Sequence, residues 1–184
     1  VGRGALKLKS FLEAMKFELA GKNALDIGSS TGGFMQILLE RGVKSVTGVD
    51  VGTDQLDASL RGDERVKIYE KTDVREFAKE NLNKFDLITC DVSFISLAEI
   101  LPVICELASA NSLIITLFKP QFEVGVGVKR NKKGVVTDAK AVNLAMKRFE
   151  VLASSLKFEL IACKECEVKG KEGNAEFFYA FNKR

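Results

Sequence analysis

The sequence has 184 residues, of which 46% are hydrophobic and 29% charged, so it is long enough to bury one substantial core and one domain is expected. Its net charge of +3 permits nucleic-acid binding without requiring it. The sequence contains no histidine, which excludes Ser-His-Asp and Cys-His catalysis and histidine-ligated metal sites. No apolar run approaches the ~20 residues of a membrane span. No signal-peptide pattern opens the sequence either, so we expect a cytoplasmic protein without a membrane segment.

Helical and extended patterns alternate along most of the sequence. Apolar spacing from Leu6 to Leu19 predicts an amphipathic helix. Strands are then expected over residues 23–27, 44–50, 66–70, 85–90 and 112–118. Helices are expected over residues 33–41, 54–60, 73–79 and 97–108. This alternation predicts an α/β fold with a mostly parallel sheet and helices on both faces.

The last third of the sequence adds a glycine-rich basic loop after Pro120, followed by a long helix over residues 138–156. Two strands over residues 159–168 and 175–182 close the sequence. Because a short loop joins them, they should pair antiparallel. The complete prediction is a seven-stranded sheet with an antiparallel C-terminal strand.

A glycine-bracketed turn follows the first predicted strand, in the stretch LDIGSSTGGF over residues 25–34. Gly28 allows a sharp turn, and the later glycines allow the backbone to approach a ligand closely. The dinucleotide fingerprint requires glycine where this sequence has Ser30. An adenosine ligand without a pyrophosphate is therefore favoured, and S-adenosylmethionine (SAM) is the candidate. An NAD-dependent enzyme is disfavoured by Ser30 and by the absence of a histidine acid.

Polar residues also follow the other strands of the parallel part of the sheet, where ligands bind at the carboxyl edge. Asp50 lies at the usual distance from the glycine turn for a carboxylate that binds ribose hydroxyls, and Asp73 is placed to meet the adenine amino group. Asp73 and Asp91 each precede a helix, so a helix-capping role stays open for both. The expected SAM site comprises Asp26, Gly28, Ser29, Ser30, Thr31, Gly32, Gly33, Phe34, Asp50, Val51, Asp73, Val74 and Asp91.

A lysine and an aspartate end two neighbouring buried strands. Lys119 is followed by Pro120, and Asp91 can pair with it. Lys7 and Glu176 are distant in sequence but can fold back over the same edge. Two lysines and two carboxylates around one pocket suggest proton abstraction by an amine. A surface salt-bridge network is the alternative.

Four cysteines occur, at positions 90, 105, 163 and 166, and we interpret them as reduced thiols. Cys163 and Cys166 form a C-x-x-C pattern. Without a second pair or a histidine it is a poor zinc site, so no metal is expected.

Several motifs in order along nearly the whole sequence resemble the methyltransferase domain of the TlyA family. They are GRGALKL at residues 2–8, LDIGSSTGGF at 25–34, DVSFISL at 91–97, KPQFE at 119–123, KGVV at 133–136 and EGNAEF at 172–177. Members are described both as ribosomal RNA methyltransferases and as haemolysins. They share the Rossmann-like fold of FtsJ-like ribose 2'-O-methyltransferases, which use SAM.

The resemblance implies a Lys-Asp-Lys-Glu tetrad, which falls on Lys7, Asp91, Lys119 and Glu176. It implies that Lys119 activates a ribose 2'-hydroxyl, that of a cytidine in ribosomal RNA, for attack on the SAM methyl group. Glu172 is the alternative for the fourth role. The resemblance also implies that residues 1–184 form a single methyltransferase domain. Residues 1–8 resemble the linker that follows an N-terminal S4-like RNA-binding domain, and that domain lies outside this sequence.

Two basic clusters flank the predicted site and suit contacts to RNA phosphates. They comprise Arg3, Lys7 and Lys9 at the start, and Lys129, Arg130, Lys132 and Lys133 in the loop. A charged loop that is merely solvated is the alternative. A membrane-active haemolysin is the competing function, and it would need a lipid-facing segment. The helix over Leu6 to Leu19 is the one candidate, and it serves better as a packed helix.

Overall fold

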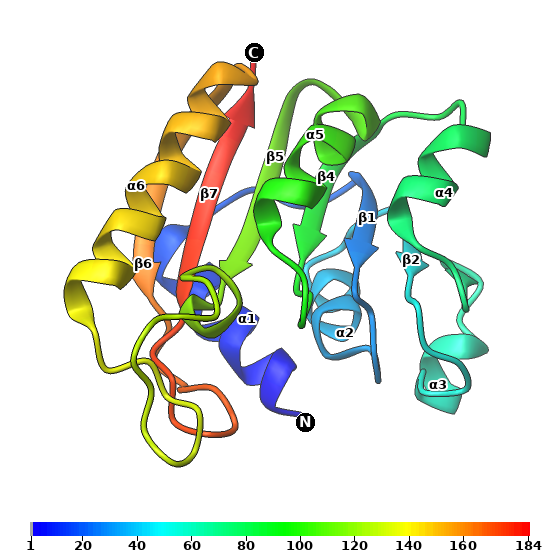
Figure 1. Cartoon of the computed structure of the whole chain (residues 1–184). Helices are drawn as coiled ribbons and strands as arrows, with labels where there is room; N and C mark the ends of the chain where they lie inside the picture. The colour runs from blue at the N-terminus through cyan, green and yellow to red at the C-terminus, as the bar shows by residue number, and fades with distance from the viewer. Residues whose placement is uncertain (1) are drawn as a thin grey trace.

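A seven-stranded sheet runs through the centre of the computed structural model, which describes residues 2–184 (Figure 1). The strands are β1 (Asn23–Ile27), β2 (Ser45–Val49), β3 (Val66–Tyr69), β4 (Phe85–Cys90), β5 (Ala108–Phe118), β6 (Phe158–Glu165) and β7 (Phe177–Lys183). They lie in the order β3-β2-β1-β4-β5-β7-β6. Strands β1 to β5 pair in parallel, whereas β7 is antiparallel to both β5 and β6. The predicted sheet with an antiparallel C-terminal strand is confirmed.

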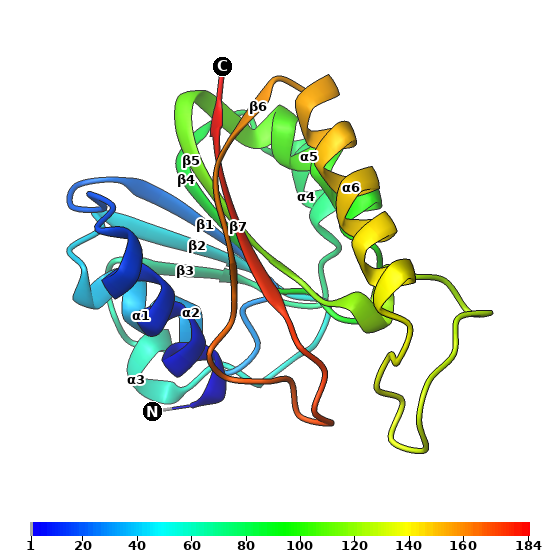
Figure 2. The same ribbon diagram turned by 90° about the vertical axis from the view of Figure 1, so that its left-hand side faces the viewer.

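Helices cover both faces of this sheet, as predicted. Figure 2 shows α1 (Arg3–Met15), α2 (Gly33–Glu40) and α3 (Ala58–Arg61) on one face. The other face carries α4 (Val74–Glu80), α5 (Leu97–Leu107) and α6 (Ala139–Ser155), and a short 3-10 helix, η1 (Pro120–Phe122), follows β5. Each face has its own apolar cluster of buried side chains. The sheet is therefore covered by packed side chains on both sides.

The first helix ends earlier than the apolar spacing predicts. It stops at Met15 because Lys16 adopts a left-handed conformation with φ 55°, and the Lys16 N–H donates to the carbonyl of Leu12. The helix expected over residues 54–60 is reduced to a single turn, which Asp57 caps by accepting from the Ser59 N–H. The chain between β2 and α3 is instead a loop that borders the carboxyl edge of the sheet.

Helix α1 packs its apolar face against α2 and the sheet. Its side chains at Ala5, Leu8, Phe11 and Leu12 are at most 3% exposed. A Cβ added at Gly33 would lie 2.8 Å from the Ala5 backbone nitrogen, so the starts of α1 and α2 touch through their backbones. Among the described residues no helix is long and apolar enough to cross a membrane.

The carboxyl group of Asp26 lies inside the core, on β1. Asp26 is 0% exposed, and its Oδ1 accepts a hydrogen bond of 2.9 Å from Thr89 Oγ1. The pKa of Asp26 is raised from 3.8 to about 7, mainly because burial disfavours the charged form. The nearby Asp91 and Asp50 carboxylates contribute to the rise, and the hydrogen bonds from Thr89 and Ser29 oppose it. Folding therefore favours the protonated form of this side chain.

This shift predicts that the protein loses stability as the pH rises. The folded state binds the Asp26 proton more tightly than the unfolded chain, so the stabilisation is full below about pH 4 and is lost as the pH rises through about 7. Replacing Asp26 by Asn removes the ionisation and keeps a partner for Thr89. We expect the free energy of unfolding of D26N, relative to wild type, to increase by about 2–3 kcal/mol between pH 5 and pH 8.

Urea unfolding at a series of pH values measures this difference. The exposed Asp54 provides the matched control, because D54N removes a carboxylate that is solvated in the folded chain. Equal pH dependence of D26N and D54N would contradict the prediction.

Candidate active site

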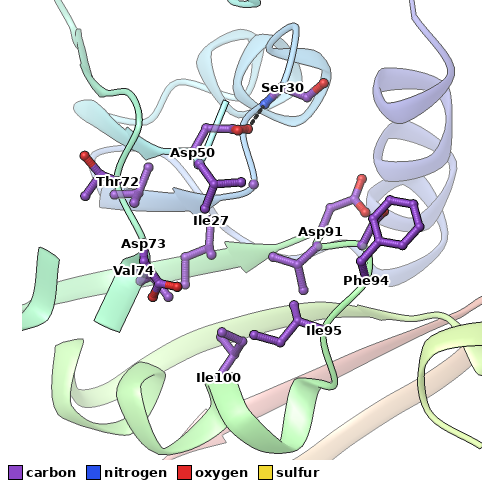
Figure 3. A pocket seen from close by; sticks show the side chains of 15 residues that line it. Ile27, Ser30, Asp50, Thr72, Asp73, Val74, Asp91, Phe94, Ile95 and Ile100 are labelled. Carbon is purple, nitrogen blue, oxygen red and sulfur yellow. Dashed lines mark hydrogen bonds between the residues drawn. The ribbon is translucent and has the colours of Figure 1, made fainter. Parts of the chain in front are cut away.

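A cavity of about 350 Å³ opens at the carboxyl edge of the sheet, between the loops that follow β1, β2, β3 and β4 (Figure 3). Apolar side chains including Ile27, Val49 and Ile100 form much of its wall. The polar groups that line it include Ser30, Asp50, Thr72, Asp73, Asp91 and Ser93. An apolar cleft with a few converging polar groups is the usual form of a small-molecule site.

The turn after β1 is shaped by a close backbone contact. Gly28 has φ +81°, and a Cβ at this position would lie 2.1 Å from the carbonyl oxygen of Asp91. Any other residue would push the β1 turn away from the chain that follows β4. Gly28 therefore sets the depth of the cavity at this point.

The carboxylate of Asp50 joins two of the loops around the cavity. Its Oδ2 accepts from the Ser30 N–H at 2.6 Å, the contact drawn in Figure 3, and its Oδ1 accepts from the Gly52 N–H at 2.7 Å. Ser30 itself has a left-handed φ of 50°. Each carboxylate oxygen keeps a second lone pair, so Asp50 can hold the turn and still accept from a hydroxyl group of a ligand.

Asp73 lines the cavity and also caps a helix. Its side chain accepts from the Arg75 N–H at the start of α4 and forms an ion pair of 2.8 Å with the Arg75 guanidinium. The hydrogen bond from Arg75 is the main cause that lowers the pKa of Asp73. The capping role that the sequence left open is thus present together with the position at the cavity.

The structure divides the thirteen residues of the expected SAM site into two groups. Lining the cavity are Gly28, Ser30, Asp50, Val51, Asp73, Val74 and Asp91. Not among its lining residues are Asp26, Ser29, Thr31, Gly32, Gly33 and Phe34. The chain turns into α2 after Ser30, so Gly32, Gly33 and Phe34 pack against neighbouring elements: a Cβ at Gly32, for example, would lie 2.2 Å from Leu60 Cδ1. Asp26 and Ser29 are buried in the core, and Thr31 is exposed.

Other lining residues were not expected from the sequence. Thr72 precedes Asp73, and Ser93, Phe94 and Ile95 follow Asp91. Phe94 is 90% exposed, has φ 65°, and its ring centroid lies 5.0 Å from that of Phe122. Its sequence context, the motif DVSFISL, was a signal that could have identified this loop as part of the site.

The four tetrad residues form two ion pairs. Lys119 Nζ lies 2.6 Å from Asp91 Oδ1 and donates to Ser93 Oγ at 3.1 Å. Lys7 Nζ lies 2.8 Å from Glu176 Oε1, and both side chains are at most 9% exposed. Unlike the members of a surface network, Lys7 and Glu176 are almost completely shielded from water.

The segment that begins with Lys119 links the two pairs. Gln121 Nε2 donates to Glu176 Oε2 at 3.4 Å. Glu123 Oε2 accepts from the Leu97 N–H at 2.9 Å, and Glu123 Oε1 accepts from Ser96 Oγ at 2.6 Å. Burial raises the pKa of Glu123. Glu172 is exposed on the loop before β7, so Glu176 and not Glu172 meets Lys7.

The basic residues expected to contact RNA lie at the same end of the molecule as this edge (Figures 1 and 2). Lys132 and Lys133 are exposed on a turn closed by a bridge between Arg130 and Val136, and Lys129 is exposed directly before it. Arg130 is partly buried and donates to the carbonyls of Val128 and Gln121, so it holds the loop. At the other cluster Arg3 donates to the Lys169 carbonyl and Lys9 is exposed, whereas Lys7 is committed to Glu176.

The residues around the cavity fit SAM. Gly28 lines the cavity, Asp50 and Asp73 provide acceptors, and much of the wall is apolar, as an adenine ring requires. Within the described residues no cluster of histidine, cysteine, aspartate and glutamate side chains could hold a metal ion. Cys163 and Cys166 are free cysteines.

Comparisons with known proteins identify relatives of this chain. The chain is 52% identical over 183 residues to the 23S rRNA (cytidine-2'-O)-methyltransferase TlyA of Campylobacter jejuni, covering 100% of the chain and 71% of that protein. It is 41% identical over 179 residues to the 16S/23S rRNA (cytidine-2'-O)-methyltransferase TlyA of Mycobacterium tuberculosis, covering 97% of the chain and 66% of that protein. The chain thus spans about two thirds of the length of these relatives.

A solved structure from Lactococcus lactis, described as a hemolysin, superimposes with a TM-score of 0.93 at 38% identity; the match covers 100% of the chain and 88% of that structure. The family model described as FtsJ-like methyltransferase matches residues 1–183. The chain therefore belongs to the FtsJ-like methyltransferase family.

Proposed function

We propose that this chain methylates the 2'-hydroxyl of a ribose in ribosomal RNA, with SAM as the methyl donor and a cytidine as the acceptor nucleoside. The observation that carries the proposal is the Lys119–Asp91 ion pair, whose aspartate lines the cavity that fits SAM. The names of the TlyA relatives supply the ribosomal and cytidine parts.

The lining of the cavity supports a role for several residues toward the cofactor. Asp50 would accept from the ribose hydroxyls of SAM, Asp73 would accept from its adenine amino group, and Val51 and Val74 would pack against the adenine ring. When bound, SAM supplies an electrophilic methyl group, whose carbon–sulfur bond breaks with both electrons remaining on sulfur.

Lys119 then acts as the base. Its uncharged amine takes the proton of the 2'-hydroxyl as an electron pair of the hydroxyl oxygen forms the new bond to carbon. The Asp91 carboxylate, 2.6 Å away, holds the resulting ammonium. Glu176, fixed by Lys7 and Gln121, helps to place the ribose. Much of the rate acceleration comes from holding the two reactants in line.

RNA reaches this edge across the exposed lysines of the basic turn, Lys129, Lys132 and Lys133, and across Arg3 and Lys9. Arg130 contributes by holding the turn in place. The exposed ring of Phe94, which lines the cavity, offers an aromatic face to an unstacked base. These features suit a single-stranded or splayed segment of RNA.

The partner is then a ribosomal subunit in the cytoplasm. That residues 1–184 form one domain, which follows an S4-like RNA-binding domain in the complete protein, stays a prediction. A membrane-active haemolysin is not proposed, because no specific observation on the described residues favours it: the apolar face of α1 packs inside the molecule.

Lys119 is the residue whose replacement tests the reaction. We expect K119A to lose at least about 100-fold in methylation rate, because the base is gone, while SAM binding persists. The measurement is nucleoside mass spectrometry of RNA from ribosomal subunits incubated with protein and SAM. The exposed Lys79, on α4, provides the control variant K79A, which should methylate as wild type does. Absence of a ribose-methylated cytidine with the wild-type protein would overturn the proposal.

Replacing Asp50 tests whether the cavity binds SAM. D50A removes the acceptor that holds both the Ser30 turn and the ribose, so the dissociation constant for SAM should rise about 10-fold or more. Calorimetry with SAM measures this change, and NAD titrated in parallel should give no binding heat. Asp63, which forms an ion pair with Arg65 and does not line the cavity, gives the control D63A, which should bind SAM normally. Tighter binding of NAD than of SAM would refute the assignment.

Replacing the lysines of the basic turn tests whether this surface binds RNA. The triple variant K129A/K132A/K133A should weaken RNA binding and lower the magnitude of the slope of log affinity against log salt by about 2. The reason is that each phosphate contact that is lost reduces the number of counterions released when RNA binds. Fluorescence anisotropy with a ribosomal RNA fragment at several salt concentrations gives the slope. The control K140A/K147A/R148A removes the same charge from exposed positions on α6. If both triple variants change the slope equally, the lysines act only through net charge.

A further inference from the structure

We propose that Ser93 is a positioning residue for the catalytic amine: its hydroxyl fixes the direction in which Lys119 Nζ faces the ribose hydroxyl. This inference rests on the proposed function, because it assigns a role at the same site. Neither the tetrad nor the expected SAM site includes Ser93.

The end of the Lys119 side chain lies close to two other side chains. Lysine has a long flexible stem that ends in a group with three donor positions. Asp91 Oδ1 lies 2.6 Å from Nζ, and Ser93 Oγ accepts from Nζ at 3.1 Å. Of these two contacts only the one to Ser93 has hydrogen-bond geometry, because Asp91 Oδ1 has no hydrogen-bond partner among the described residues, so Ser93 is the group that fixes one of the three positions.

The proposed reaction requires the lone pair of the Lys119 amine to point in one direction. The uncharged amine has two N–H bonds and one lone pair, and the lone pair must face the 2'-hydroxyl. An N–H donated to Ser93 limits the lone pair to two positions, and repulsion by the Asp91 carboxylate, 2.6 Å from Nζ, disfavours the position nearer to it. Asp91 alone would leave the amine free to rotate about its last carbon–nitrogen bond, which would misalign the base for part of the time.

The loop that carries Ser93 is well suited to hold it. Asp91, two residues earlier, donates its N–H to the Ile27 carbonyl at 3.0 Å, and Leu97, four residues later, donates to Glu123. Between these anchors Phe94 adopts a left-handed φ of 65°, which is unfavourable for an aromatic residue. The strained turn places the Ser93 hydroxyl at the wall of the cavity and against Lys119.

The experiment compares three variants with wild type in steady-state methylation of ribosomal subunits. S93A removes the hydroxyl, and S93T keeps it. S155A is the matched control, because Ser155 is an exposed serine at the end of α6 whose hydroxyl donates to the Leu152 carbonyl, and it has no hydrogen bond to any residue of the site. We expect S93A to lower kcat about 10-fold with unchanged KM for SAM and RNA, S93T to retain kcat within about 3-fold, and S155A to leave kcat unchanged.

A second readout does not depend on activity. The Lys119 side chain is 12% exposed, so loss of the Ser93 contact should free it and speed its acetylation by acetic anhydride about 3-fold, as followed by peptide mass spectrometry. The other lysines should react as in wild type, and S93T should match wild type. Thermal unfolding of all variants shows whether each is folded.

Two results would overturn the inference: a kcat of S93A equal to that of wild type, or equal losses of kcat in S93A and S93T. Failure of the proposed function is a different result, in which the wild-type protein does not methylate RNA at all. In that case the acetylation rates still decide the Ser93 contact, and rates equal in S93A and wild type would reject it.

Discussion

The register of three parallel strands is the constraint on which the site depends. Ile27 pairs with Cys90, and Cys90 pairs with Thr116, so β1, β4 and β5 end at nearly the same level. The next residues along two of these strands, Gly28 and Asp91, are therefore forced together. Only a glycine can stand at position 28, because a Cβ there would lie 2.1 Å from the Asp91 carbonyl. Lys119, just beyond β5, lies at the same edge, one strand further along the sheet.

The reversed strand β7 completes the site from the other side. Phe118 pairs with Phe177 in an antiparallel ladder, so the residue after β5 and the residue before β7 come to the same end of the sheet. These residues are Lys119 and Glu176. A parallel seventh strand would have sent its first residue to the opposite edge. Helix α1, held close to α2 through Gly33, then brings Lys7 to Glu176.

Sequence patterns predicted the sheet and part of the site, for a physical reason. Asp50, Asp73 and Asp91 follow strands whose ends were visible in the apolar pattern, and the carboxyl edge of a parallel sheet gathers such residues. Family resemblance placed Lys7 and Glu176 in one tetrad, but their ion pair was not predicted, because it depends on how α1 packs on the sheet.

The sequence did not determine in which direction the side chains of a motif point. The residues from Gly32 to Phe34 belong to the same motif as Gly28 and Ser30, yet they contact α1 and α3 and not the cavity. Spacing within a motif gives no direction for side chains once a turn has changed the course of the chain. The contact of Ser93 with Lys119 was not expected for the same reason. The left-handed turn at Phe94 sets the direction of the Ser93 side chain, and the sequence does not show this turn.

The distribution of charge agrees with two ligands of opposite sign. Asp50, Asp73 and Asp91 line the cavity, and their carboxylates favour a cationic ligand. The exposed lysines of the basic turn lie outside it and favour a polyanion. Under the proposed function, SAM enters with a positive sulfonium and leaves as a neutral thioether. The carboxylates that attract the cofactor therefore bind its product less strongly, and methyl transfer itself promotes release.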